Sequence, residues 1–424
     1  MTVSLLFIAW RNLFNRRVQT LITIGVVAVG IAVTLAILLL SSGIKQGIVR
    51  ASEPFGMLVG SKGSSSQLVF NTIFLMDNPL ANLEPEYYES LADDERVSQA
   101  VPFALGDNYE GFRIVGTSVS FFDLKARPVD PAYFRLASGR LFEQPFEAVI
   151  GAKVARETGL KPGDTFVSAH GVTESREQEE HTEHPYTVVG VLKGVAAPSD
   201  QGIYVNMESY WLGHEHEDEH EGEVSGENGA TAGFENSEAE HSAEERGVTA
   251  ALIKPKSYTD LMTMYQEINR GKDAQAVFPG QTLARIFDMM GSGEQVLRIV
   301  GYVVLGMAGL TVILALYGAT VERRRTVAIL RAIGAGRAEV LAIVLLESAL
   351  VMLIGCAAGY AAGYGLAYLL TGYLGEFLSI SAPIRFQAGQ LSLVGYVALA
   401  GTAAGLLPAL SAYRTETARY LNAS

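Results

Sequence analysis

The sequence predicts an α-helical membrane domain of four transmembrane helices, arranged one plus three, with a large mixed α/β extracytoplasmic domain inserted between helices one and two. Three observations support this fold class. Four long apolar runs carry no charge, residues 43–294 hold 20 Lys and Arg against 40 Asp and Glu, and short β-branched segments occur within that acidic block. An acidic block argues against nucleic acid as a partner, because phosphate binding depends on Lys and Arg. The single cysteine, Cys356, excludes an internal disulfide.

The membrane helices are indicated by runs without Asp, Glu, Lys or Arg. These runs are Val18–Ile44, Ile299–Val321, Ser348–Gly375 and Phe386–Tyr413. Each exceeds the roughly 20 residues that a helix needs to cross a bilayer core. Buried helices of a soluble protein rarely reach this length without a polar face. The first run is also longer than the roughly 7–15 apolar residues of a signal peptide, so we expect a retained anchor.

Arginine distribution orients these helices. Arg11, Arg16 and Arg17 precede the first run, five arginines lie between the second and third, and Arg414 and Arg419 follow the fourth. Because short cytoplasmic segments are rich in Lys and Arg, both termini should be cytoplasmic. The expected segments are a cytoplasmic amphipathic helix (1–17), transmembrane helix 1 (18–44), the extracytoplasmic domain (45–294), transmembrane helix 2 (296–321), a cytoplasmic loop (322–339), transmembrane helices 3 (340–371) and 4 (388–413), and a cytoplasmic tail (414–424).

Glycines in the last two runs favour close helix packing. They are Gly355, Gly359 and Gly363 in the third run, and Gly401 and Gly405 in the fourth. Small residues at this spacing let helix backbones approach closely in lipid, although glycine is also common in membrane helices generally. No charge lies mid-membrane, which argues against a proton-driven transporter. Glu347 should lie near the cytoplasmic mouth, within reach of arginines or water.

The inserted domain shows alternating strand and helix patterns. The expected strands are 111–117, 165–168, 186–192 and 247–253; the expected helices are 85–91, 152–159 and 258–269; and 198–210 should form a loop, a strand and a short helical turn. The Gly/Ser-rich residues 60–66 predict a hinge or turn. Residues 41–50, together with a helix from about Asp288, should form a helical stalk joining the domain to the membrane.

A histidine-rich acidic segment interrupts the domain at about 212–246. It contains 12 Asp and Glu with almost no large apolar side chain, so it should be disordered. His214, His216 and His220 alternate with carboxylates there, and such a set suits Zn²⁺ or another divalent metal. The alternative is a solvated acidic loop that does not use metal.

No catalytic motif stands out, and the chain has no G-x-x-x-x-G-K-[ST] phosphate loop. The loop after the second run has apolar residues at helical spacing with arginines on the other side. This amphipathic basic helix, Glu322–Arg337, predicts either a segment resting on lipid headgroups or a docking element for a cytosolic partner.

Several segments resemble the MacB/FtsX-like ABC-transporter permease family, of the mechanotransmission type. The segments that carry the resemblance are Glu322–Arg337, Leu345–Leu350, Ala9–Arg17, Gly139–Phe142, Ala148–Ala155, Leu160–Asp164 and Gly405–Arg414. Together they extend over nearly the whole chain except about 212–246. Thr326 stands where the family often has Glu, so the role of that carboxylate does not carry over.

The resemblance implies a homodimeric inner-membrane permease, not itself an enzyme, bound to two copies of a cytosolic ABC ATPase that holds ATP and Mg²⁺. The coupling residues would be Glu322, Arg323, Arg324, Arg325, Arg331, Gly334 and Arg337. Further candidate partners are a periplasmic adaptor, a substrate-binding protein, an outer-membrane channel and membrane lipid. Candidate cargoes are an exported substrate, a lipoprotein or a metal- or haem-linked compound. The alternative function is a transmembrane signal transmitter that regulates an envelope hydrolase or sensor.

Overall fold

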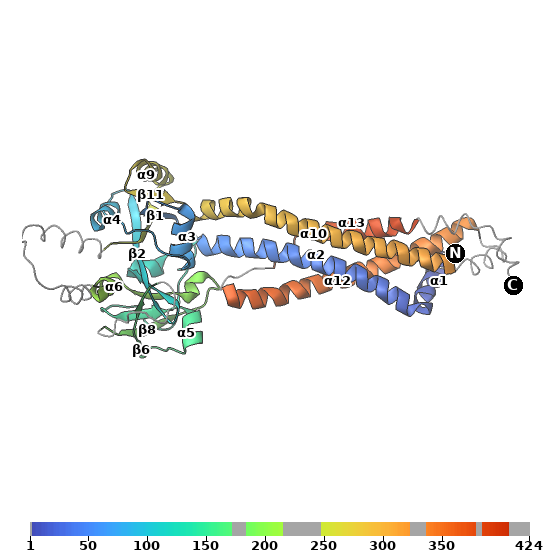
Figure 1. Ribbon diagram of the computed structural model, residues 1–424, viewed down its shortest axis with the longest axis horizontal. Coiled ribbons are helices and arrows are strands. Elements are labelled where there is room, and N and C mark those ends of the chain that lie inside the picture. The colour runs from blue at the N-terminus through green and yellow to red at the C-terminus, as the bar shows by residue number, and fades with distance from the viewer. Residues whose placement is uncertain (1, 172–183, 215–246, 323–335, 379–383, 407–424) are drawn as a thin grey trace, which may run out of the picture. The chain divides into compact units, whose positions relative to one another are not determined.

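The structure is a computed structural model that describes residues 2–171, 184–214, 247–322, 336–378 and 384–406 (Figure 1). The chain divides into two compact units. We call the first the helical unit; it comprises Met1–Ile44, Met290–Tyr373 and Ala382–Ser424. The second, the sheet domain, comprises Lys45–Met289 together with Leu374–Ser381.

Long apolar helices make up the helical unit. They are α1 (Thr2–Asn15), α2 (Arg17–Ser52), α10 (Pro279–Glu322), α12 (Arg337–Leu378) and α13 (Ala388–Ala404). Three stretches are long and apolar enough to cross a membrane, namely Arg17–Ser52, Arg298–Ala315 and Ala338–Tyr373. The fourth predicted span contains α13, which is described over 17 residues, and its predicted end at 413 lies outside the described residues.

The ends of α2 and α10 show how far helix continues beyond the apolar runs. Helix α2 extends to Ser52, which agrees with helix over 41–50. Helix α10 begins at Pro279, earlier than the expected start near Asp288. Proline is well suited to the first turn of a helix, because its missing N–H would have no partner there. The apolar Leu283 of this early part is buried, so core packing supports the added turns.

The sheet domain is built on an 11-stranded mixed sheet, in the order β11-β1-β10-β2-β3-β9-β5-β8-β4, with β6 pairing β8 and β7 pairing β2. The strands are β1 (Met57–Ser61), β2 (Val97–Tyr109), β3 (Phe112–Thr117), β4 (Leu136–Gly139), β5 (Glu147–Ile150), β6 (Thr165–Phe166), β7 (Ala169–His170), β8 (Tyr186–Leu192), β9 (Ile203–Asn206), β10 (Ala250–Pro255) and β11 (Ala274–Val277). Most neighbours are antiparallel, whereas β3–β9 and β5–β8 are parallel.

Short helices complete the domain. They are α3 (Ser65–Phe74), α4 (Pro85–Ala92), η1 (Val119–Asp123), α5 (Ala152–Thr158), η2 (Pro198–Gln201), α6 (Met207–His214) and α9 (Tyr258–Arg270). Helix α5 ends at Gly159, whose φ of 78° suits a residue without a Cβ atom. Helix α9 begins where the Ser257 side chain accepts a hydrogen bond from the Asp260 N–H. Helices α4, α5 and α9, and strands β3 and β8, confirm the corresponding predictions.

The predicted hinge or turn at 60–66 is shorter than expected. Bends occur at Lys62 and Gly63, whereas Gly60 and Ser61 belong to β1 and α3 starts at Ser65, capped by the Ser64 hydroxyl. The serines are helix-capping residues, and buried Leu68 follows them on the helix. Helix α6 continues through His214, so the first residues of the segment predicted at about 212–246 are helical. Residues 215–246, including the predicted disorder, lie outside the described residues.

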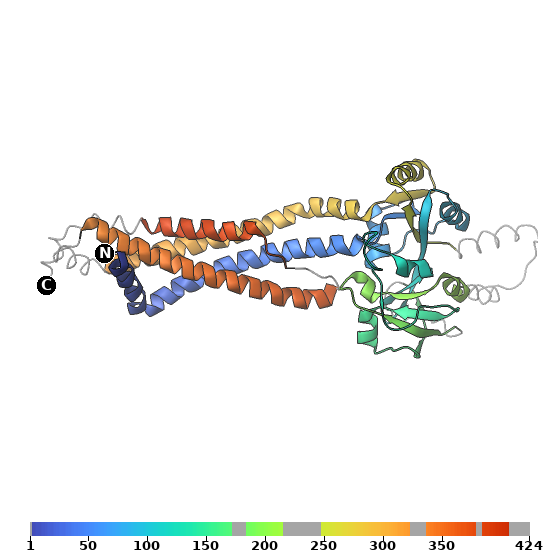
Figure 2. The ribbon, with the colours of Figure 1, turned by 180° about the vertical axis from the view of Figure 1, so that it is seen from behind.

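Successive residues along each strand face two hydrophobic cores. Met57 and Val59 belong to one core, which also receives side chains of α4 and α9. Leu58 faces the other core, which receives α3 and the aromatic side chains of η1. Figures 1 and 2 show α4 and α6 on one side of the strands and α3 on the other. The central strands are therefore buried on both faces, whereas β4 at the sheet edge is exposed.

Candidate functional site

The glycine face of α12 lies directly against α2. A Cβ atom added at Gly359 would lie 2.7 Å from the carbonyl oxygen of Ala28, and one at Gly363 would lie 3.0 Å from the Leu35 Cβ atom. At Gly355 the same atom would lie 2.9 Å from the Cβ of Val27. Real Cβ atoms essentially never approach as closely as at Gly355 and Gly359, and the contact at Gly363 is tighter than most, so a side chain at these glycines would push the two helices apart. The glycines of α12 thus lie directly on backbone and Cβ atoms of α2.

Gly401 in α13 and Gly405 directly after it contact side chains of α12. A Cβ added at Gly401 would collide with Met352, and one at Gly405 would lie 2.8 Å from the Ser348 Cβ atom. The Tyr364 hydroxyl also donates a hydrogen bond to the side-chain oxygen of Gln390. Small residues and one polar pair therefore join α12 to α13.

Polar contacts link α2 to α10. The Thr34 hydroxyl lies 2.8 Å from the carbonyl oxygen of Gly30 in its own helix and 3.2 Å from that of Gly301 in α10. Farther along, the Gln19 amide donates to the carbonyl oxygen of Ala315 at 3.0 Å. Backbone carbonyls thus accept hydrogen bonds from side chains of the neighbouring helix, which holds α2 in register with α10.

The N-terminal helix α1 contacts α12 through a buried carboxylate. The side-chain amide of Asn12 donates to Oε1 of Glu347 at 2.6 Å, and Glu347 is only 6% exposed. A hydrogen bond to a buried charged group is among the stronger ones in proteins. An arginine or water was the expected partner of Glu347; the structure adds an amide from α1.

The outward face of α10 is apolar. Ile299, Val303, Met307, Leu310 and Leu314 are each more than half exposed. So large an apolar surface is unusual on a soluble monomer and marks contact with lipid or with another chain.

The sequence of the chain matches two family descriptions. The MacB-like periplasmic core domain matches residues 20–270, more than half of the chain. The FtsX-like permease C-terminal matches residues 298–417. The chain belongs to the MacB/FtsX-like family of ABC-transporter permeases. The permease thus joins apolar membrane helices to a periplasmic domain, as the resemblance implied.

Two solved structures are similar in part to this permease. The extracellular domain of the noncanonic ABC-type transporter YknZ from Gram-positive bacteria shares 14% identity at a TM-score of 0.31, covering 52% of this chain and 98% of that one. The periplasmic region of MacB from Actinobacillus actinomycetemcomitans shares 12% identity at a TM-score of 0.33, covering 57% and 95%. No curated protein is similar enough to this permease to count as a relative.

The predicted coupling and metal residues fall largely outside the described residues. Glu322 ends α10 and Arg337 begins α12, while Arg323, Arg324, Arg325, Arg331 and Gly334 lie between them, undescribed. His214 ends α6, and His216 and His220 lie beyond it. Within the described part of the chain, no group of three or more His, Cys, Asp or Glu side chains could hold a metal ion.

Sequence reasoning missed the partners of α2 and α1. The apolar pattern indicated neither that Thr34 and Gln19 would bond to α10 nor that Asn12 would reach Glu347, which lies 335 positions away. The available signal was the presence of polar residues within otherwise apolar helices. In lipid, such a side chain usually forms a hydrogen bond to a neighbouring helix.

Proposed function

We propose that the chain is the permease subunit of an ABC transporter whose ATP hydrolysis occurs in a separate cytosolic ATPase. Two copies of the permease and two of the ATPase would form the working assembly. Closure of the ATPase pair on ATP would rearrange the helical unit and thereby move the periplasmic domains, a process called mechanotransmission. The permease family supports this assignment, as does the lack of a phosphate loop in the sequence.

The observation that carries the proposal is the contact of α12 with α2. Their backbones approach so closely at Gly359 that an added Cβ atom would lie 2.7 Å from the carbonyl oxygen of Ala28. Tightly packed helices transmit a displacement better than they open a pore, because packed interiors deform little. Described residues of α2, α10 and α12 also place no charge in the middle of the apolar spans.

The proposed topology has four transmembrane helices with both termini in the cytoplasm of an inner membrane. Segment boundaries are those given by the apolar runs, with helix 4 covering 388–413 and the loop 322–339 facing the cytoplasm. The arginines at both ends of the spans support this orientation. Labelling of single cysteines from either side of the membrane, in a Cys356→Ala background, would test it.

The loop 322–339 is the proposed coupling segment. Glu322, Arg323, Arg324, Arg325, Arg331, Gly334 and Arg337 would dock the ATPase, since charges at the rim of an interface steer and align a partner. Reversing Arg323, Arg324 and Arg325 to Glu should leave insertion unchanged and weaken ATPase binding and stimulation. Reversing Arg414 and Arg419 in the tail is the matched control.

The experiment on function measures ATP hydrolysis. The purified permease alone should hydrolyse no ATP, and addition of its ATPase should give hydrolysis that the triple reversal lowers. ATP hydrolysis by the permease alone would contradict the assignment of hydrolysis to a separate ATPase. Equal turnover and complex stability in the triple reversal would reduce the loop to a lipid-facing segment.

The proposed substrate is a compound of the cell envelope and belongs to one of three classes. These are an exported small molecule or peptide, a lipoprotein, and a metal- or haem-linked compound. The third rests on His214, His216 and His220 as weak ligands for Zn²⁺ or another divalent metal. Metal binding requires neutral imidazole, so it should fall as the pH drops through about 6.5. Calorimetric titration of the full chain with Zn²⁺, with and without these histidines, tests this; equal heats would remove the metal link.

A further inference from the structure

A cavity of about 370 Å³ lies at the β4 edge of the sheet domain. One wall is the loop that leads from η1 into β4, with Asp130, Tyr133 and Arg135. The facing wall is the turn that follows β8, from Lys193 to Val195. Its volume is at the low end of the roughly 300–1,000 Å³ typical of ligand pockets. It therefore suits a small molecule or one end of a larger one.

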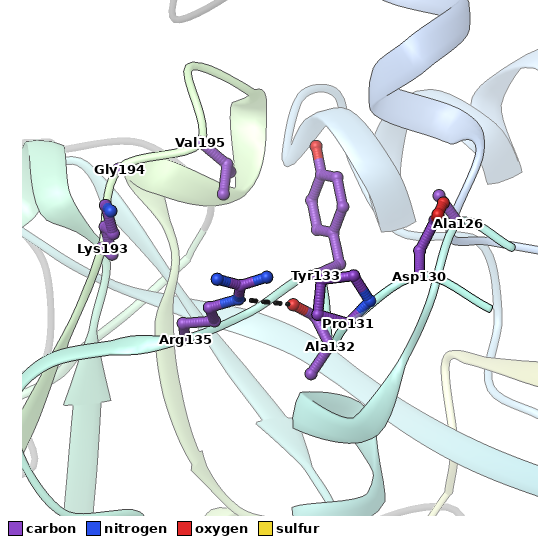
Figure 3. Close-up of a pocket in the computed structure, with 9 residues that line it drawn as sticks. All are labelled: Ala126, Asp130, Pro131, Ala132, Tyr133, Arg135, Lys193, Gly194 and Val195. Carbon is purple, nitrogen blue, oxygen red and sulfur yellow. Dashed lines mark hydrogen bonds between the residues drawn. The ribbon is translucent and has the colours of Figure 1, made fainter. Parts of the chain in front are cut away.

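The strand register brings the two cationic residues side by side. Strands β4 and β8 are antiparallel, with Leu136 opposite Leu192. The Lys193 N–H continues this ladder by donating to the Arg135 carbonyl oxygen at 2.7 Å. Arg135 Nε in turn donates to the carbonyl oxygen of Ala132 at 3.2 Å, as Figure 3 shows. One hydrogen bond thus joins the exposed guanidinium group to its own loop.

The turn that bears Lys193 is held by a buried carboxylate. Asp200 is 8% exposed and accepts hydrogen bonds from the N–H groups of Val195, at 3.0 Å, and Ala196, at 2.7 Å. Burial raises the pKa of Asp200, while these backbone donors and the Arg156 charge oppose the increase. Both walls of the cavity are therefore built on ordered hydrogen bonds and not on flexible surface chain.

Charged and polar side chains line this cavity without forming hydrogen bonds or ion pairs with one another. Among the described residues, the Lys193 amine, the Asp130 carboxylate, the Tyr133 hydroxyl and the two terminal nitrogens of Arg135 have no hydrogen-bond or ion-pair partner. Figure 3 shows Arg135 and Lys193 on one side of the Tyr133 ring and Asp130 on the other. Burial raises the pKa of Tyr133 to about 12, with Asp200 and Glu53 contributing, so the phenol keeps its proton and can donate it to a hydrogen bond.

We propose that this cavity binds a small zwitterion, with its carboxylate or phosphate on Arg135 and Lys193 and its ammonium group facing Asp130. A guanidinium group binds such planar or tetrahedral anions through two parallel hydrogen bonds. The carboxylate across the ring selects against a purely anionic ligand, because like charges repel. A dipeptide, whose ammonium and carboxylate lie close together, and a phosphoethanolamine headgroup both have this chemistry. The inference needs the sheet domain alone and does not depend on an ATPase.

The test is calorimetric titration of the full chain, without any ATPase, in maltoside micelles that carry no charge. The probes are alanyl-alanine and phosphoethanolamine, each also in N-acetylated form. We expect at least one free zwitterion to bind and its acetylated form to bind several-fold more weakly. Binding by alanyl-alanine assigns a short peptide, and binding by phosphoethanolamine assigns a headgroup.

Matched variants locate the binding. Arg135→Gln and Lys193→Gln should each weaken it by about tenfold, the size expected for losing a charged hydrogen bond. Arg127→Gln removes the same charge from the same loop outside the cavity, and it should change the affinity less than about twofold. Circular dichroism checks that each variant is folded. The proposal is overturned if neither zwitterion binds, or if Arg127→Gln weakens binding as much as Arg135→Gln does.

Discussion

The helical unit and the sheet domain differ in the residues at their closest internal contacts. In the helical unit, glycines of α12 let the backbone of α2 approach until no Cβ atom fits between them. In the sheet domain, aromatic rings fill the core: Phe121 stacks on Phe134 at 4.3 Å and on Tyr204 at 4.7 Å between ring centroids. Each choice follows from the surrounding solvent.

In water, burying a large ring removes much apolar surface from solvent and stabilises the fold strongly. In lipid, the surroundings are as apolar as a leucine side chain, so burial of a large residue gains little. Close backbone contact and hydrogen bonds must hold the helices instead. The two units should therefore respond differently to the same kind of substitution.

The two tryptophans make this difference measurable. Trp10 lies in α1 of the helical unit and Trp211 in α6 of the sheet domain. With Trp10→Phe, fluorescence reports on the sheet domain, and with Trp211→Phe it reports on the helical unit. Unfolding of each unit can then be followed in the full chain.

The largest expected effect is truncation of the aromatic core. Phe121 is 1% exposed and contacts Phe134, Tyr204 and Phe122. Phe121→Ala should lower the free energy of unfolding of the sheet domain by about 3–5 kcal/mol, through lost burial and an unfilled cavity. Denaturant titration followed at Trp211 measures it. Val119→Ala, on the exposed side of the same turn, should cost little; similar losses in both would contradict the aromatic core as the source of stability.

The reverse substitution should destabilise the helical unit. Gly359→Leu inserts a side chain where the carbonyl oxygen of Ala28 already lies 2.7 Å from an added Cβ. Overpacking of this kind costs about 1–3 kcal/mol, which should lower the thermal midpoint reported by Trp10. Gly365→Leu is the control, because an added Cβ there meets open space on the same helix. If both variants melt alike, backbone contact does not hold α2 and α12 together.

A third substitution tests the hydrogen bond between α1 and α12. Asn12→Leu removes the amide that donates to Glu347 and should lower the stability of the helical unit by about 1–2 kcal/mol. Proteolysis of α1 in micelles should also become faster, since this contact ties α1 to the rest of the unit. Asn15→Leu, on the exposed side of α1, provides the comparison.

The smallest effect concerns pH. A hydrogen bond from the Arg140 guanidinium holds the pKa of Glu147 at about 2, assisted by the Glu143 and Gln144 N–H groups. Because this pKa is lower in the folded state, the stabilisation is present above pH 4.5 and is lost as the pH falls toward 2. Arg140 is exposed to solvent, so the loss should be small. Glu147→Gln should flatten this part of the pH profile; an unchanged profile would remove the pair from the stability of the domain.

Local sequence patterns predicted much of the fold. A β-branched run bounded by glycine gave β3 and β8, and Gly159 marked the end of α5. Strand β2 was missed because Pro102 and the polar pair Asp107–Asn108 interrupt its alternation. The surrounding sheet supplies the pairing that these residues would not predict alone. Helix α3 was missed because its capping serines resembled a loop.

For the contact between α12 and α2, the sequence predicted only one of the two contacting helices. The four-residue spacing of Gly355, Gly359 and Gly363 indicated a contact face on α12. Nothing in the sequence specified that α2 would occupy it, because neighbours in a bundle depend on the chain as a whole. The cavity at the β4 edge of the sheet domain was not predicted either, because Arg135 and Lys193 become neighbours only through the β4–β8 pairing.

The pairing of β1 with β11 has a consequence for how this protein can evolve. Along the chain, β1 is the first strand of the sheet and β11 is the last, and these strands are direct neighbours, with Leu58 opposite Val277. A domain whose two ends lie together can be exchanged, enlarged or trimmed without altering the distance between the helices that carry it. The same helical unit could thus acquire new binding specificities by replacement of the sheet domain alone.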